Sequence, residues 1–483
     1  MPTGSRAGVY QTLVVGLYSI SQPFLSEYEL ADNVHDMNQP QNKKVLAIAL
    51  PMTAASISIP LLGLVDTAIL GHLEQATYLA AVAAGSSLLT MLFWLFAFLR
   101  MGSTGLTARA WGAGNYNRCL ELLLQSLLLA LILGITLVTM QQPLLKAILN
   151  LIKPSDEAYG LAMEYCQIRI FAAPATLGTL CAVGWLLGLQ RVRATLFLML
   201  FTNLANIGLD FLFIVGLDMN SRGAAYASLT AELLGFLVAL ALIIQHVKGM
   251  HGTINWLHLK QWHRYGEFLR INRHLFIRTA CLVFTMTFFT AQGARQGDTI
   301  LATNAILMQL LLLVAYTQDG FAHAAESLAG HAIGRNNLPS FYQICLETTI
   351  WGIGISCIAS LAYLFFPEAI ISIFTDLPSV SKTALIYWPW LVTLPLLGVI
   401  CFMADGIFIG SGKTRAMQDT MLLATFGVFI PLWFLTRSMG NHGLWITYLS
   451  FLSIRSISMG GMFTYYSWKK SWIPAPNHQQ VID

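Results

Sequence analysis

Long apolar stretches that recur along the whole chain constrain its fold more than any other feature. Windows of about 19 residues separate twelve of them, and each is close to the length at which a helix crosses a hydrocarbon core of roughly 30 Å. The expected spans are residues 45–72, 78–105, 119–143, 159–188, 195–216, 223–246, 274–295, 300–330, 341–366, 384–411, 418–436 and 443–467. Only 10% of the 483 residues are charged, against about a quarter in an average soluble domain. The sequence therefore predicts an all-α polytopic membrane protein with twelve transmembrane helices.

The placement of Lys and Arg predicts how these spans are oriented. With the N-terminus inside, sixteen of these residues fall in the inner tails and loops and six in the outer loops. Cytoplasmic loops of membrane proteins carry an excess of Lys and Arg, and this bias sets the orientation. We therefore expect both termini of this multi-pass chain to be cytoplasmic.

The chain also repeats itself at a constant offset of 222 residues. The matched pairs include Gly112 with Gly334, Asn115 with Asn337, Gly184 with Gly406, and Gly188 with Gly410. The repeat unit contains six spans, an even number, so its two copies cross the membrane in the same sense and are parallel repeats. We expect two six-helix lobes around a central cleft, an arrangement suited to alternating access.

These patterns divide the chain into five parts. We expect a cytosolic tail at 1–42, an N-lobe at 43–247, a cytosolic linker at 248–272, a C-lobe at 273–470 and a C-terminal tail at 471–483. The first part lacks the charged start and strong apolar core of a signal peptide, so it is a tail or an over-long start that precedes a true start at Met37. The linker is basic and aromatic, and we interpret it as a segment on an anionic inner leaflet. The expected partner is thus the lipid bilayer, with no nucleic acid.

Two prolines and an acid mark the first span. Pro51 and Pro60 each remove a backbone donor and crowd the carbonyl four residues earlier, so this helix should bend or unwind easily. Asp66 follows six residues after Pro60. A carboxylate at membrane depth is costly unless it is neutral, paired or hydrated, which makes Asp66 a candidate cation-coupling group. The alternative is that Asp66 only caps the outer end of the helix.

The fifth span carries a polar face. Asn203, Asn206 and Asp210 are spaced i, i+3 and i+7 and therefore share one side of the helix. Such a cluster in an apolar helix indicates either an inward-facing site or a structural clasp between helices. Ser228 in the sixth span adds a hydroxyl to the candidate residues.

The second lobe departs from strict symmetry. Asp66 has no acidic repeat partner, because the offset of 222 leads to Phe288. The eighth span instead carries polar residues on one face, namely Tyr316, Asp319, His323 and Glu326. The tenth span carries Asp405. Tyr316, Asp319 and Asp405 are candidate substrate or cleft residues, and the two acids either line the cleft or pair with Arg278.

Several signatures of enzymes are absent from the sequence. It contains no GxxxxGK[ST] for ATP, no HExxH or GxSxG, and no Cys/His set with metal-ligand spacing. The seven cysteines lie singly in or beside apolar stretches, as buried thiols do. We expect no catalytic residues, no metal and no cofactor, and the remaining interpretation is transport driven by an ion gradient.

These residues resemble the multidrug and toxic compound extrusion (MATE) family, in its DNA-damage-inducible F (DinF) branch. The resemblance covers about 43–470 and is most specific in LALPM and PLLGLVDTAILGHL of the first span and in NLANIGLDFLF of the fifth. Further matching motifs lie at 98–115, 184–194, 315–334, 405–417 and 440–445. The resemblance implies a multidrug exporter of a bacterial inner membrane, which exchanges amphipathic or cationic compounds for protons, with Na⁺ the alternative ion. We expect it to act as a monomer.

The same resemblance assigns residue roles. It implies that Asp66 takes up the coupling proton, that Asn206 and Asp210 belong to the same site, and that the first helix bends at Pro51. Two other functions remain open. A flippase for lipid-linked saccharides would need several arginines in the cleft, for which the candidates are Arg100, Arg169, Arg278, Arg295 and Arg455. An intramembrane lipid-modifying enzyme would need an acid–histidine pair, for which Asp319 and His323 are the candidate.

Overall fold

The computed structural model describes residues 41–71, 76–152, 156–253 and 261–473, and these form helices joined by short connections. The first half comprises α2 (Gln41–Gly71), α3 (Ala76–Leu95), α4 (Phe98–Gly112), α5 (Tyr116–Thr139), α6 (Gln141–Ile152), α7 (Asp156–Arg169), α8 (Ala173–Gly188), α9 (Val192–Asp210), the π-helix η2 (Phe211–Gly216) and α10 (Asn220–Lys248). The second half comprises α12 (Gly266–Ala294), α13 (Asp298–Gly334), α14 (Leu338–Phe365), α15 (Pro367–Phe374), α16 (Pro378–Ser411), α17 (Thr414–Leu422), the π-helix η4 (Leu423–Phe429), α18 (Ile430–Thr436) and α19 (Asn441–Trp468).

The helices confirm an all-α polytopic membrane protein. Ten helical segments among the described residues are long and apolar enough to cross a membrane. They include α3–α4, α7–α8, α9–η2 and α17–α18 as single crossings. The helices α2 (31 residues) and α19 (28 residues) are as long as these ten crossings, and together with them they match the twelve that the sequence predicts. The short helices α6 and α15 lie in the connections between crossings. Helix α12 begins at Gly266, within the segment 248–272 that the sequence predicts to be a linker.

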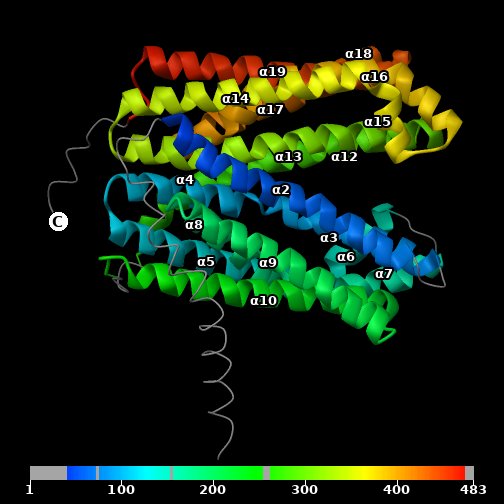
Figure 1. The fold of residues 1–483 in the computed structure, drawn as a ribbon, viewed down its shortest axis with the longest axis horizontal. Coiled ribbons are helices and arrows are strands. Elements are labelled where there is room, and N and C mark those ends of the chain that lie inside the picture. Colours follow the sequence, from blue (N-terminus) through cyan, green and yellow to red (C-terminus); the bar gives the residue numbers. More distant parts are fainter. Residues whose placement is uncertain (1–40, 72–75, 153–155, 254–260, 474–483) are drawn as a thin grey trace, which may run out of the picture.

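The crossings form two side-by-side groups (Figure 1). The helices coloured blue to green, α2 to α10, make one lobe, and those coloured green to red, α12 to α19, make the other. The blue helix α2 lies along the seam and packs against α9 of its own lobe and α13 of the opposite lobe. The first helix is thus the element most directly placed to respond to both halves.

Close glycine contacts repeat in the two lobes at the offset of the sequence repeat. Gly184 of α8 packs on the Arg100 carbonyl of α4, and Gly406 of α16 packs on the Ala322 carbonyl of α13. The next turn of each helix repeats the pattern, with Gly188 on the Thr104 carbonyl and Gly410 on the Glu326 carbonyl. Small residues let helix backbones approach closely in lipid, where apolar burial gives little drive for association.

The seam between the lobes has the same symmetry. Gly112 at the end of α4 packs on the His331 carbonyl of α13, and Gly334 at the end of α13 packs on the Arg109 carbonyl of α4. The repeat offset of 222 residues relates Gly112 to Gly334 and Arg109 to His331, so each contact is the symmetry equivalent of the other. The helices that follow also start alike, since Asn115 caps the Arg118 amide at 2.9 Å and Asn337 caps the Ser340 amide at 3.1 Å. The parallel repeat of the sequence is therefore a two-fold relation in space.

A methyl group at this seam should weaken the contact between the lobes. In Gly112→Ala or Gly334→Ala the added Cβ would overlap a backbone carbonyl that cannot turn aside, at a cost of about 1–3 kcal/mol. We expect the melting temperature of the detergent-purified protein to fall by several degrees. Gly354→Ala is the matched control, because its Cβ would meet open space in the middle of α14. Unchanged melting of both seam variants would contradict a tight contact here.

Candidate functional site

A buried polar cluster lies on α9 of the N-lobe, between α2 and α10. Asn203 Nδ2 donates to Ser58 Oγ of α2 at 2.8 Å, and Asn206 Nδ2 donates to Ser228 Oγ of α10 at 3.2 Å. Asn206 is 4% exposed and Asp210 is 2% exposed. Three helices therefore direct polar atoms into one part of an apolar lobe. Ser58 belongs to this cluster, although its spacing in the sequence did not indicate it.

Asp66 reaches the level of this cluster by its position on the backbone. The first and fifth crossings, α2 and α9, run in the same direction, because four crossings separate their starts. Asp66 lies eight residues beyond Ser58 and Asp210 lies seven residues beyond Asn203, so both are about 10–12 Å past the Ser58–Asn203 hydrogen bond. The side chain of Asp66 lies outside the described part of the chain.

The helix changes its winding immediately after Asp210. The π-helix η2 starts at Phe211, so the extra residue in each turn begins beside the buried acid. The repeat-related crossing of the C-lobe contains the π-helix η4. Short π-helical stretches inside α-helices frequently accompany functional sites, because they leave the backbone hydrogen-bond ladder locally shifted.

An ion-pair cluster occupies the interior of the C-lobe. Asp405 of α16 accepts from Arg278 of α12 and, at 3.0 Å, from Nη2 of Arg455 of α19. The exposed fractions of the three residues are 8%, 7% and 3%. Of the two possibilities that the sequence left open for Asp405, the structure shows the pairing with Arg278. Arg455 is an additional partner that only the packing of α19 on α16 reveals.

A further ion pair lies where α4 meets α13. Arg100 Nη1 donates to Glu326 Oε2 at 3.2 Å, so the ion pair joins the two lobes. Asp319, on the same helix as Glu326, is half-buried and lies within electrostatic range of Arg100 and Arg278. Tyr316 and Asp319 interact electrostatically one turn apart on α13. Asp319 thus connects the seam to the C-lobe cluster.

The predicted site residues therefore fall into two groups. Asn203, Asn206, Asp210 and Ser228 belong to the N-lobe cluster. Asp319 and Asp405 belong to the C-lobe side. Pro51 and Pro60 both lie inside α2, which connects the two. Within the described residues, no group of three His, Cys, Asp or Glu could hold a metal ion.

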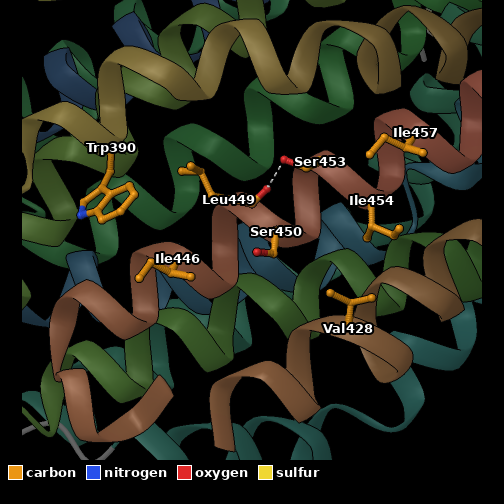
Figure 2. Close-up of a pocket in the computed structure, with 8 residues that line it drawn as sticks. All are labelled: Trp390, Val428, Ile446, Leu449, Ser450, Ser453, Ile454 and Ile457. Carbon is orange, nitrogen blue, oxygen red and sulfur yellow. Dashed lines mark hydrogen bonds between the residues drawn. The ribbon is translucent and has the colours of Figure 1, made fainter. Parts of the chain in front are cut away.

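A hollow of about 320 Å³ lies elsewhere, between α16, η4 and α19 (Figure 2). It is lined by Trp390, Val428, Ile446, Leu449, Ser450, Ser453, Ile454 and Ile457. One serine hydroxyl is already used, since Ser453 Oγ donates to the Leu449 carbonyl at 2.8 Å. This apolar hollow contains none of the predicted site residues.

The fold and these clusters define a class of protein: a membrane carrier with two repeat-related lobes and ionisable groups buried within and between them. The family model described as MatE matches residues 51–212 and 275–435, one match in each lobe. The chain belongs to this family, whose members are transporters and not enzymes.

Individual relatives agree. The DNA damage-inducible protein F of Escherichia coli K12 is 36% identical over 436 residues, which cover 89% of this chain and 93% of that protein. A Synechocystis protein named as a probable multidrug resistance protein NorM is 24% identical and covers 90% and 97% of the two chains. A MATE transporter in an outward-facing conformation matches with a TM-score of 0.79 at 21% identity, over 90% and 97%.

The two rival functions lose their main support. Four of the five arginines that an anionic lipid cargo would need are already in ion pairs: Arg100, Arg169, Arg278 and Arg455. Their partners are Glu326, Glu232 and Asp405. The membership in a transporter family removes the lipid-modifying enzyme for which Asp319 and His323 were the candidate pair.

Neutralising Asp405 should destabilise the C-lobe. Asp405→Asn leaves Arg278 and Arg455 buried without their shared carboxylate, and breaking a buried ion pair costs about 3–5 kcal/mol. We expect a lower melting temperature and a lower yield in membranes. The double variant Asp405→Asn/Arg278→Gln removes one stranded charge and should regain part of the stability. An Asp405→Asn protein as stable as the wild type would show that the ion pairs of Asp405 do not stabilise the C-lobe.

Proposed function

We propose that this protein is a secondary active exporter that moves amphipathic or cationic organic compounds out of the cell in exchange for protons, by alternating access of its two lobes. The observation that carries the proposal is the buried polar cluster of α9 beside the proline-containing α2. The family membership supports the transport reaction, and the name of the Synechocystis relative supports drug-like cargo.

The coupling site in this proposal is Asp66 with Asn206 and Asp210. An acid in an apolar helix favours its neutral form, since a buried charge without a partner is expensive. Asn206 and Asp210 are buried at the backbone level of Asp66 and are the proposed hydrogen-bond partners of its carboxyl group. Loading and unloading of one proton would change which of these hydrogen bonds form.

The first helix is the proposed moving part. Pro51 and Pro60 remove two backbone donors from α2, so this helix bends at lower cost than an uninterrupted one. Its neighbours lie in both lobes, α9 on one side and α13 on the other. A change of protonation on α2 can therefore alter the contact between the lobes through a bend at Pro51.

The cargo in this proposal contacts polar groups of both lobes. Asn203 and Ser228 are candidates on the N-lobe side, and Tyr316, Asp319 and Asp405 on the C-lobe side. Asp319 is the best candidate for attracting a cationic compound, because it is a half-buried acid near the seam. Asp405 is already paired with two arginines and would act through them.

The proposed setting is the inner membrane of a bacterium, with both termini in the cytoplasm and the chain acting as a monomer. The relation to the Escherichia coli protein supports the location, and the excess of Lys and Arg in alternate loops supports the orientation. Two complete lobes in one chain supply both halves of an alternating-access machine, which supports a monomer.

Protons rather than sodium ions should drive export. In proteoliposomes loaded with a fluorescent cationic dye, we expect transport to follow an imposed pH difference and to ignore a sodium gradient at constant pH. Asp66→Asn should insert normally and lose pH-driven transport by about tenfold or more, because an amide cannot cycle its charge. Asp298→Asn, an exposed acid at the start of α13, is the control and should transport normally. Transport by sodium alone, or full activity of Asp66→Asn, would overturn the assignment.

A further inference from the structure

The hydrogen bonds that join the two lobes lie between the middle of the helices and one of their ends. The inter-lobe hydrogen bonds include Thr53 Oγ1 to the Thr317 carbonyl at 3.2 Å, Ser327 Oγ to the Leu187 carbonyl at 2.7 Å, and Gln41 Nε2 to Ser340 Oγ at 3.1 Å. The glycine contacts of Gly112 and Gly334 lie at the same end. A long contact of 4.0 Å between Thr287 and Met91 is the exception among the described residues. The count of basic residues assigns the joined end to the cytoplasm.

One ion pair lies inside this joined end. Arg100 is 15% exposed at its side chain and Glu326 is 1% exposed, and the pair joins α4 of the N-lobe to α13 of the C-lobe at 3.2 Å. The Glu326 backbone is held against Gly410 of α16, so the carboxylate belongs rigidly to the C-lobe. Separation of the lobes at this end must therefore break the pair.

The pair also breaks the two-fold symmetry of the seam. The offset of 222 relates Arg100 to Ala322 and Glu326 to Thr104, so the symmetry-related position has no charge. The neighbouring glycine contacts obey the symmetry. Good packing of the seam thus needs no ion pair, and a buried ion pair is on average no more stabilising than apolar packing. Its presence calls for a role other than stability.

The carboxylate can also bind a proton where it is. Glu326 Oε2 takes the bond from Arg100, and the Thr104 hydroxyl of α4 also interacts with this carboxylate, while Glu326 Oε1 is buried and accepts no well-formed hydrogen bond among the described side chains. Removing Arg100 would leave an isolated charge in an apolar seam, which is far more costly than a neutral acid. Protonation of Glu326 is therefore the low-cost way to release Arg100.

We propose that Glu326 is a second proton-binding site, and that its ion pair with Arg100 is a latch that keeps the lobes together at the cytoplasmic end. A proton added to the carboxylate neutralises Glu326 and frees Arg100, and the lobes then separate at this end. Once the seam is open to water, the acid releases its proton to the cytoplasm and the pair can form again. This inference rests on the proposed exchange of protons and adds a site distinct from Asp66.

The surroundings of Glu326 set the balance between the two states. The groups that act on its carboxylate are Arg100 and the Thr104 hydroxyl on α4, and Asp319 on α13. His323 lies one turn before Glu326, with its Nδ1 buried and unpartnered among the described residues. Behind these, Arg278 on α12, Asp405 on α16 and Arg455 on α19 form the C-lobe cluster, to which Asp319 is electrostatically coupled. A cationic cargo beside Asp319 would weaken its influence on Glu326.

The test measures lobe separation directly. Spin labels at Ala113→Cys and Pro339→Cys, exposed positions of opposite lobes at the joined end, report the distance between the lobes in lipid nanodiscs. Cys357→Ser removes the one exposed cysteine, and the other six are buried. We expect the separated fraction of the labelled protein to rise as the pH falls from 8 to 6.

The variants isolate the latch from the coupling site. Glu326→Gln should raise the ratio of separated to joined lobes by about tenfold at pH 8 and abolish the pH response. The pH response should persist in Asp66→Asn, so failure of the proton-driven export and failure of the latch give different results. Exchanging the charges, Arg100→Glu with Glu326→Arg, should restore the joined state. Glu347→Gln, a carboxylate of α14 bound to Gln343 within the C-lobe, is the control.

Two outcomes would overturn the proposal. One is a Glu326→Gln protein that stays joined and keeps the pH response of the wild type. The other is a pH response that disappears in Asp66→Asn while Glu326 and Arg100 are intact. If Glu326→Gln does not fold, Arg100→Gln tests the same point. Without Arg100, Glu326 would take up a proton, and the fraction of protein with separated lobes should rise as in Glu326→Gln.

Discussion

A hydrocarbon core offers no hydrogen-bond partner to a polar group, and this constraint orders the whole molecule. It makes every crossing a helix, and it favours buried polar side chains that have a partner on another crossing. Asn203 finds Ser58, Asn206 finds Ser228, and Asp405 finds two arginines. The polar contacts are few, so each one fixes which helices are neighbours. The lobes are held in register by these contacts and by close glycine packing, since apolar surfaces alone do not distinguish helices from lipid.

The same constraint explains how much could be predicted. Length and apolarity of the stretches gave all twelve crossings, because no other structure of about 20 apolar residues is stable in lipid. The short helices α6 and α15 were missed, since they do not span the membrane and carry no such signal. The π-helices η2 and η4 were also missed, because one extra residue in a turn leaves no periodic mark in a uniformly apolar segment.

Sequence patterns in the candidate site give relations within one helix and none between helices. The i, i+3, i+7 spacing indicates that Asn203, Asn206 and Asp210 share a face, because one helix fixes its own geometry. The partner Ser58 and the joining of Arg278 with Arg455 at Asp405 depend on how neighbouring helices are rotated and shifted. The Arg100–Glu326 pair depends further on how whole lobes dock. None of these relations has a local signature, although every residue involved stands out as polar in an apolar segment.

The reciprocal glycine contacts of Gly112 and Gly334 bear on the origin of the chain. A contact in which residue i meets j while the equivalent of j meets the equivalent of i is the isologous contact of a two-fold homodimer. The seam thus has the form of an interface between two copies of a half-length chain. In such a homodimer any substitution appears twice, so an arginine at position 100 would also stand at position 322. A single Arg100–Glu326 pair without a symmetry-related counterpart is therefore incompatible with two identical halves and requires halves of different sequence, which one continuous chain permits.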